Sequence, residues 1–163
     1  MKVLFILLTT IFISSCSVFC QVRDTVKHDI QLIQIYYRSG PDILNTFNET
    51  YQKDLIPGTV TTVMWLTTRE QEILLTKIES AKFFSFPDTL YSTPNVMVTP
   101  GCGWIIRMKY KQLDKTVVVQ CPIDESKYGK YENDIYGIQS LLNDIIVSKP
   151  EYKALPERKG GYQ

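Results

Sequence analysis

The sequence predicts an α+β domain, in which an antiparallel sheet carries two helices packed on one of its faces. Several segments are rich in β-branched and aromatic residues, or alternate between apolar and polar residues, as strands do. Two other segments repeat apolar residues every three or four positions, as amphipathic helices do. In chain order, the predicted elements are strands, a helix, a hairpin and a second helix.

Strand-forming residues dominate two segments of the amino-terminal half. Residues 30–37 predict a strand that stops at Ser39-Gly40-Pro41-Asp42, a strong turn signal. Residues 59–66, which follow Pro57-Gly58, predict a second strand. The intervening residues 43–51 are ambiguous.

A helix is predicted from about Thr68 to Lys82. Thr67 and Glu70 have the spacing of a capping box, in which the hydroxyl and the carboxylate each accept a hydrogen bond from a free backbone donor of the first turn. Apolar residues then recur at helical spacing, at Leu74, Ile78 and Ala81.

Three phenylalanines lie in residues 83–88, which close this helix. We expect their rings to belong to the core rather than to an exposed docking patch, because they lie at a helix end beside a proline turn. From there to Thr99 we expect a loop or a short edge strand.

A hairpin is predicted from residue 102 onward. Its first strand alternates, and one face holds Cys102, Trp104, Ile106, Met108 and Tyr110. Residues 116–121 return as the partner strand. Pairing Cys102 with Cys121 also pairs Trp104 with Val119 and Ile106 with Val117, and closes a two-residue loop at 111–112. A four-residue loop at 111–114 keeps the same face but shifts the partners by one diagonal.

Cys102 and Cys121 are a candidate disulfide. In either register the sulfurs can meet if the neighbouring glycines let the strand bend, and closing this 20-residue loop would stabilise the fold by about 3 kcal/mol. Two buried free thiols are the alternative. We expect no metal site, because there is no CxxC spacing and only one, distant histidine, His28. That distance also argues against His28 as the base for a nucleophilic Cys102.

The last predicted element is a helix that ends by Ser148-Lys149-Pro150. Its apolar positions are Tyr131, Ile135, Ile138, Leu142 and Ile145. We expect residues 150–163 to form a polar carboxy-terminal tail, loosely ordered because it has little to bury. The single α+β domain is thus assigned to residues 21–149.

Residues 1–20 are assigned to an export signal. Lys2 precedes an apolar run from Val3 to Ile13, and small polar residues follow. The run is close to half of the roughly 20 residues that a membrane-spanning helix needs.

Two cleavage sites compete at the end of this signal. Ile13-Ser14-Ser15-Cys16 resembles the lipobox of bacterial lipoproteins. This resemblance covers only the signal region, and it implies that Cys16 becomes the acylated, membrane-anchored first residue. Cleavage before Gln21 would instead release a protein without lipid, but it puts Cys20 where a small residue, usually Ala, is expected. The fit of the residues before Cys16 favours the lipoprotein, although it leaves Cys20 as an odd thiol.

Composition limits the classes of partner. Without Lys2, 17 of the 18 basic residues remain against 17 acidic ones. Such a neutral chain gives no electrostatic basis for binding nucleic acid. The remaining chain of under 150 residues, with 44% hydrophobic residues over the full sequence, fits one domain with a real core.

No residue pattern carries an evident chemistry. We find no nucleophile, metal or phosphate-loop motif, and we expect no cofactor. The acids Asp124, Glu125, Glu132 and Asp134 are expected to be solvated or to lie at a helix start, rather than to form a catalytic pair. Ten tyrosines suggest either a binding surface or, as we favour, the rim of the core.

Residues 150–156, with the sequence PEYKALP, and the α+β pattern resemble small exported bacterial domains of unknown function. This resemblance implies no activity. The hypothesis is an exported, lipid-anchored, non-enzymatic binding module of the bacterial envelope, whose sheet face binds an unknown envelope protein or glycan. It would lie at the outer membrane or periplasmic face, or be soluble in the periplasm or medium. An envelope enzyme with an unrecognised site and a periplasmic inhibitor or immunity-type protein are the alternatives.

Overall fold

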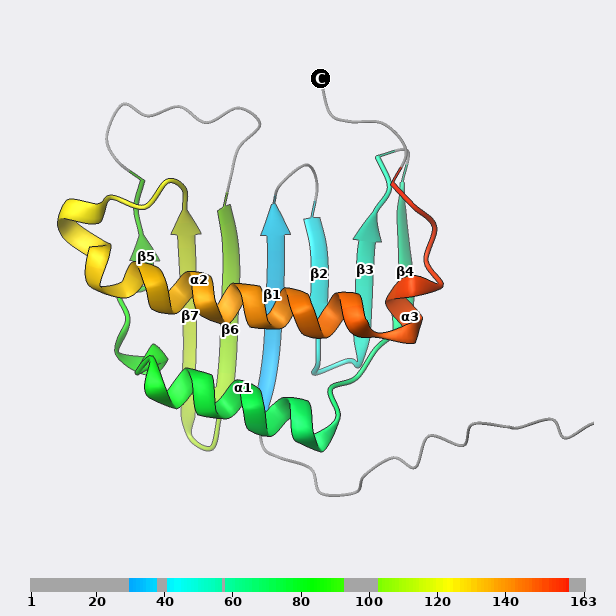
Figure 1. Ribbon diagram of the computed structural model, residues 1–163, viewed down its shortest axis with the longest axis horizontal. Helices are drawn as coiled ribbons and strands as arrows, with labels where there is room; N and C mark the ends of the chain where they lie inside the picture. The colour runs from blue at the N-terminus through cyan, green and yellow to red at the C-terminus, as the bar shows by residue number, and fades with distance from the viewer. Residues whose placement is uncertain (1–29, 38–40, 57, 93–102, 159–163) are drawn as a thin grey trace, which may run out of the picture.

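The computed structural model describes residues 30–37, 41–56, 58–92 and 103–158, with the backbone alone for residues 30–37 and Pro41. These residues form one seven-stranded sheet, with the helices on one of its faces (Figure 1). Within these residues no helix is both long and apolar enough to cross a bilayer.

The strands follow the order β4-β3-β2-β1-β6-β7-β5 across the sheet. They are β1 (Ile30–Tyr37), β2 (Pro41–Asn45), β3 (Thr50–Asp54), β4 (Thr59–Val63), β5 (Thr89–Leu90), β6 (Gly103–Tyr110) and β7 (Leu113–Gln120). Every neighbouring pair is antiparallel except β5 with β7. The predicted antiparallel sheet is confirmed, and β5 is the short edge strand expected before residue 99.

The ambiguous segment 43–51 belongs to a hairpin of β2 and β3. Its turn is held by the side chain of Asn45, whose amide oxygen accepts hydrogen bonds from the backbone N–H groups of Phe47, at 3.0 Å, and Asn48, at 3.3 Å. Asparagine side chains commonly close turns in this way. Pro41 and Asp42 are the first residues of β2, so the last two residues of the predicted turn belong to a strand, and its first two lie outside the described residues.

The β6–β7 hairpin adopts the first of the two predicted registers. Trp104 pairs with Val119, Ile106 pairs with Val117, and Tyr110 pairs with Leu113 across a two-residue loop. Lys111 in this loop has a positive φ of 54°, as tight hairpin turns require. The four-residue loop is therefore excluded.

The first helix, α1 (Thr68–Ser80), begins as predicted. The Thr67 hydroxyl accepts a hydrogen bond from Glu70 N at 3.3 Å, and the Glu70 carboxylate accepts one from Thr67 N at 2.7 Å. A single 3₁₀ turn, η1 (Phe83–Ser85), follows. Phe83 and Phe86 are buried, so the prediction that these rings join the core is confirmed.

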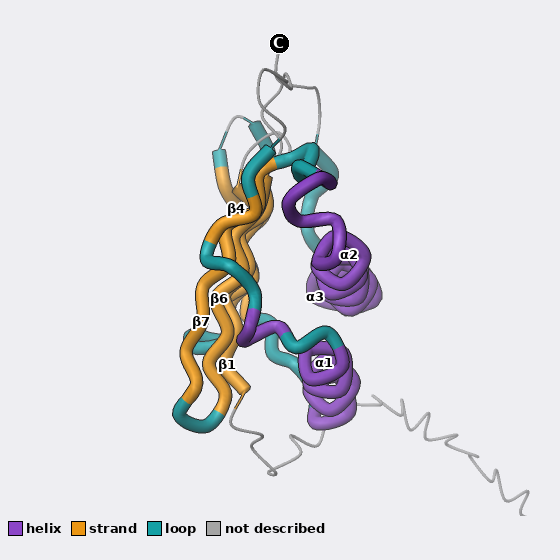
Figure 2. Tube along the Cα trace, turned by 90° about the vertical axis from the view of Figure 1, so that its left-hand side faces the viewer, coloured by secondary structure: helices purple, strands orange, loops and turns teal. Residues whose placement is uncertain are grey.

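The second helix, α2 (Glu125–Ser148), ends where it was expected to end but begins earlier than its apolar repeat. Asp124 caps its amino terminus, and its carboxylate accepts hydrogen bonds from Ser126 N at 3.1 Å and Ser126 Oγ at 2.6 Å. The first turns are polar because they extend beyond the edge of the core. Both long helices cross the strands on the same face of the sheet (Figure 2).

The core lies between this face and the two helices. Its fully buried large side chains are Leu44, Met64, Leu74, Ile78, Phe83, Leu90, Ile106, Met108, Ile135, Ile138 and Leu142. The helical positions among them are the ones that the three- and four-residue spacing indicated.

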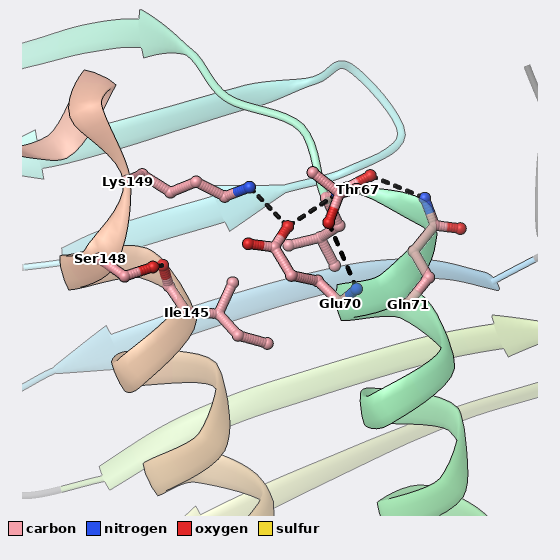
Figure 3. Close-up of polar contacts among 7 residues, drawn as sticks. Thr67, Glu70, Gln71, Ile145, Ser148 and Lys149 are labelled. Carbon is pink, nitrogen blue, oxygen red and sulfur yellow. Dashed lines mark hydrogen bonds and ion pairs between the residues drawn. The ribbon is translucent and has the colours of Figure 1, made fainter. Parts of the chain in front are cut away.

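A partly buried ion pair joins the start of α1 to the end of α2. Lys149, 8% exposed, places its Nζ 2.5 Å from the Glu70 carboxylate (Figure 3). Glu70 therefore serves the capping box and the contact between the helices at once.

The carboxy-terminal segment differs from its prediction. Residues 150–153 form the short helix α3 (Pro150–Lys153), and the chain up to Arg158 is attached to β2 and β3. Arg158 donates hydrogen bonds to the Asp54 carbonyl at 2.8 Å and to Asp42 Oδ1 at 3.0 Å. Lys53, buried in β3, donates to the Pro156 carbonyl at 2.9 Å. The expected loose order is thus wrong for residues 150–158.

Candidate functional site

The face of the sheet opposite the helices is covered by no described helix (Figure 2). We call it the open face. Its positions follow from the alternation of buried and exposed residues and from the strand register. Among the side chains that the structure describes, the exposed and half-buried ones on the open face are Ile43 and Asn45 of β2, Thr50 and Gln52 of β3, Thr59, Thr61 and Val63 of β4, Ile105, Arg107 and Lys109 of β6, and Asp114, Thr116, Val118 and Gln120 of β7.

An aliphatic row crosses the middle of the open face. Val118 pairs with Ile105 across β7 and β6, and the backbone of Ile35 in β1 pairs with Ile105 on one side and with Ile43 on the other. The side chains of Ile43, Ile105 and Val118 are half-buried. Among the side chains that the structure describes, polar residues occupy most of the adjacent positions.

Arg107 is held in one orientation on this face. Its guanidinium donates hydrogen bonds to both carboxylate oxygens of Asp114, at 3.1 Å and 2.8 Å, and lies 5.7 Å from the centroid of the Phe47 ring. The hydrogen bond from Arg107 lowers the pKa of the Asp114 carboxyl, and the same bond raises the pKa of Arg107. Exposed ion pairs stabilise folds little, but this one orients a planar donor group toward the solvent side of the sheet.

The open face offers hydrogen bonding rather than catalysis. Its threonine hydroxyls and its asparagine and glutamine amides can donate and accept, and Arg107 adds charged donors. Its exposed carboxylate in the described residues is Asp114, which is paired with Arg107; Asp54, which the register places opposite Thr59, is buried. Within the described residues, no group of three or more histidine, cysteine or acidic side chains could hold a metal ion.

Most of the acidic residues considered as a catalytic pair in the sequence either cap a helix, form an ion pair or are exposed. Asp124 is the cap of α2, and the hydrogen bond from the Ser126 hydroxyl lowers the pKa of its carboxyl, with Lys127 nearby. Asp134 lies 3.6 Å from Lys77 of α1, in an ion pair between the two helices. Glu125 is exposed in the first turn of α2. No pair of these acids is arranged for acid–base chemistry within the described chain.

The predicted cysteine sites lie largely outside the described residues. Cys16, Cys20, His28 and Cys102 belong to the undescribed segments. Cys121 follows β7 directly and is half-buried against the core. The disulfide with Cys102 therefore stays a prediction.

Most described tyrosines pack at the edge of the core. Tyr110, Tyr128, Tyr131, Tyr136 and Tyr152 are partly buried against it, and Tyr136 contacts the Trp104 ring at a centroid distance of 5.2 Å. Tyr51 is buried, and burial, reinforced by the charge of Asp42, raises its pKa far above the usual range. This distribution agrees with a rim of the core for most described tyrosine side chains, although Tyr91 is exposed and the side chains of Tyr36 and Tyr37 lie outside the description.

Sequence reasoning missed the contact of Arg107 with Phe47 because 60 positions separate the two residues in the chain. The alternation in β6 did place Arg107 on the polar face, but the turn that presents Phe47 lay in the ambiguous segment.

No protein-family model and no curated protein matches this sequence.

Proposed function

We propose that this protein is an exported, lipid-anchored, non-enzymatic binding module of the bacterial envelope, and that it engages an envelope protein or glycan through the open face. The observation that carries the proposal is the uncovered, hydrogen-bonding surface of a seven-stranded sheet, with Arg107 pre-oriented by Asp114 and Phe47. Mixed polar and half-buried aliphatic surfaces of this kind suit protein and glycan partners.

A covalent cross-link can test whether the open face is the binding surface. A photoreactive residue placed at Thr116, which is exposed on β7, should form an adduct in the native host. The same residue at Asn143, which is exposed on α2, is the matched control and should form none. Adding Arg107→Glu should abolish the Thr116 adduct. Adducts from Asn143 alone, or a Thr116 adduct indifferent to Arg107→Glu, would contradict the proposal.

The anchor is tested separately by the mass of the amino-terminal peptide of protein isolated from its host. An acylated Cys16 is expected, since Ile13-Ser14-Ser15 precede it in the order of a lipobox. A peptide that begins at Gln21 would eliminate the anchor but retain export, and a peptide that retains Met1 would eliminate both.

We include a Cys102–Cys121 disulfide in this proposal. The pairing of Gly103 with Gln120 supports this proposal, because the same register, if it continued by one residue, would set position 102 opposite position 121. A peptide map under non-reducing conditions should contain the linked pair, and separate peptides carrying free thiols would refute it.

A further inference from the structure

The two edges of the sheet differ in how they meet solvent. β5, at one edge, is only two residues long, and the preceding Asp88 is paired with Lys115. β4, at the other edge, is five residues long and has the uncharged sequence TVTTV, with no proline. Folded proteins usually protect a sheet edge by shortening it or by placing charges on it. Among the residues that the structure describes, β5 is protected in this way and β4 is not.

The backbone of β4 alternates between bonded and outward-directed residues. Met64 donates its N–H to the Glu49 carbonyl at 2.8 Å, so Met64, Thr62 and Val60 direct their backbone groups toward β3 in the antiparallel ladder. Thr59, Thr61 and Val63 consequently direct theirs away from the sheet. All three residues are exposed, and Val63 exposes 56% of its surface. These six groups form a template for another strand.

We propose that β4 pairs with β4 of a second copy of this chain, in an antiparallel dimer whose two-fold axis passes beside Thr61. In this register Thr61 lies opposite Thr61 of the partner subunit, and Thr59 lies opposite Val63 of the partner subunit. All three outward residues then form hydrogen-bonded pairs, and each pair exchanges two N–H···O bonds. The pairing needs no bulge and brings no like charges together.

The uncharged sequence of β4 favours a second copy as the occupant. A two-fold axis places each residue near its own counterpart, so a charged residue in the middle of the strand would meet an identical charge. β4 has none along its whole length, and its central threonine meets a threonine, a favourable cross-strand pair. The dimer would join two open faces into one continuous surface, and this consequence alone rests on the proposed function.

The test places a charge at the two-fold axis. The full exported protein should sediment as a dimer at high concentration, and Thr61→Lys should make it monomeric because two ammonium groups would then face each other. Gln52→Lys is the matched control. Gln52 pairs with Thr61 on the same face but lies one strand inward, so its two-fold copies lie about 14 Å apart at a strand spacing of about 4.8 Å. At that distance their repulsion is screened, and the control should stay dimeric.

Complementary charges test the register itself. A mixture of Thr61→Lys and Thr61→Glu proteins should recover the dimer, although each variant alone is monomeric, because opposite charges then meet at the axis. Circular dichroism should show that both variants are folded, since Thr61 is exposed. A wild-type monomer at about 1 mM, a Thr61→Lys dimer, or a mixture that stays monomeric would each overturn the proposal. Sedimentation measures the mass of the dimer, whereas the test of the open face measures a cross-link to a partner. A monomeric result would therefore overturn the dimer without deciding the proposed function.

Discussion

Single residues decide how closely β6 and β7 approach each other. Gly103 begins β6, and a Cβ atom built on it would lie 2.7 Å from the Val119 carbonyl oxygen. Real side chains do not come this close to a rigid backbone atom, so the strand ends can pair only because residue 103 has no side chain. Sequence reasoning noted the glycines that flank Cys102 but could not identify the atom that requires one of them.

Gly103→Ala should therefore destabilise the protein by about 2 kcal/mol, as overpacking typically does. The matched control is Gly58→Ala, because a Cβ atom there would meet nothing within 4 Å. That control should be neutral or stabilising by up to about 1 kcal/mol. Urea unfolding curves measure both values, and equal effects of the two substitutions would refute the close approach.

The cap of α2 makes stability depend on pH. The Ser126 hydroxyl lowers the pKa of the Asp124 carboxyl in the folded protein, below its unfolded value of about 3.9. A lowered folded-state pKa stabilises the fold above the unfolded pKa, and this contribution is lost as the pH falls through the folded pKa. Asp124→Asn should thus be less stable than the wild type near neutral pH, and the difference should shrink below about pH 4.

The control for this prediction is Asp144→Asn, which changes an exposed acid later in the same helix. At neutral pH this control should change the free energy of unfolding by at most about 0.5 kcal/mol, because Asp144 is exposed and does not cap the helix. Urea unfolding at a series of pH values provides the measurement. A constant difference for Asp124→Asn down to pH values below the folded pKa would show that its charge is irrelevant.

At the scale of elements, the sequence predicted types and boundaries best where the signal was local. The capping box of α1 and the apolar spacing of α2 follow from neighbouring residues. The β6–β7 hairpin has one of the two registers that its neighbouring residues allowed. The β2–β3 hairpin was missed, because its strands are short and its turn depends on the Asn45 side chain. Short strands contain too few alternations to be recognised.

The junction of α1 and α2 is the element contact most open to test. Glu70→Ala removes both the capping bond and the partner of Lys149, leaving a buried ammonium without its carboxylate. We expect a loss of about 3 kcal/mol in the free energy of unfolding. Glu70→Gln keeps a capping oxygen but not the charge, so its loss should be smaller.

Glu79→Ala is the control for this junction, since it removes an exposed glutamate near the other end of the same helix. It should change the free energy of unfolding by at most about 0.5 kcal/mol. If Glu70→Ala cost no more than Glu79→Ala in thermal or urea unfolding, the pair would contribute nothing to holding the helices together.

At the scale of the whole molecule, the carboxy-terminal segment packs against β2 and β3. Arg158 reaches Asp42, 116 positions earlier in the chain, and the Tyr152 ring lies 5.7 Å from the Tyr51 ring. Lys53 lies 4.8 Å from the Tyr152 centroid while it donates to Pro156. The segment thus provides partners for polar groups that β2 and β3 bury.

Removing Arg158 should consequently weaken the whole fold. Arg158→Ala deprives the Asp42 carboxylate and the Asp54 carbonyl of a charged donor, and we expect a loss of about 2 kcal/mol. Arg69→Ala, which changes an exposed arginine of α1, should cost at most about 0.5 kcal/mol. Equal unfolding midpoints for the two variants in urea would show that the segment is dispensable.

The sequence by itself determined the fold class, most of the elements and the polar side of β6, because caps, periods and tight turns depend on residues a few positions apart. Only the tertiary structure decided the strand order, the attachment of residues 150–158 and the contact of Arg107 with Phe47. These depend on residues many positions apart, whose partners no local pattern specifies. For the same reason, only the strand order shows that β4 lies at an edge of the sheet. Whether a strand is an edge strand depends on which other strands pair with it.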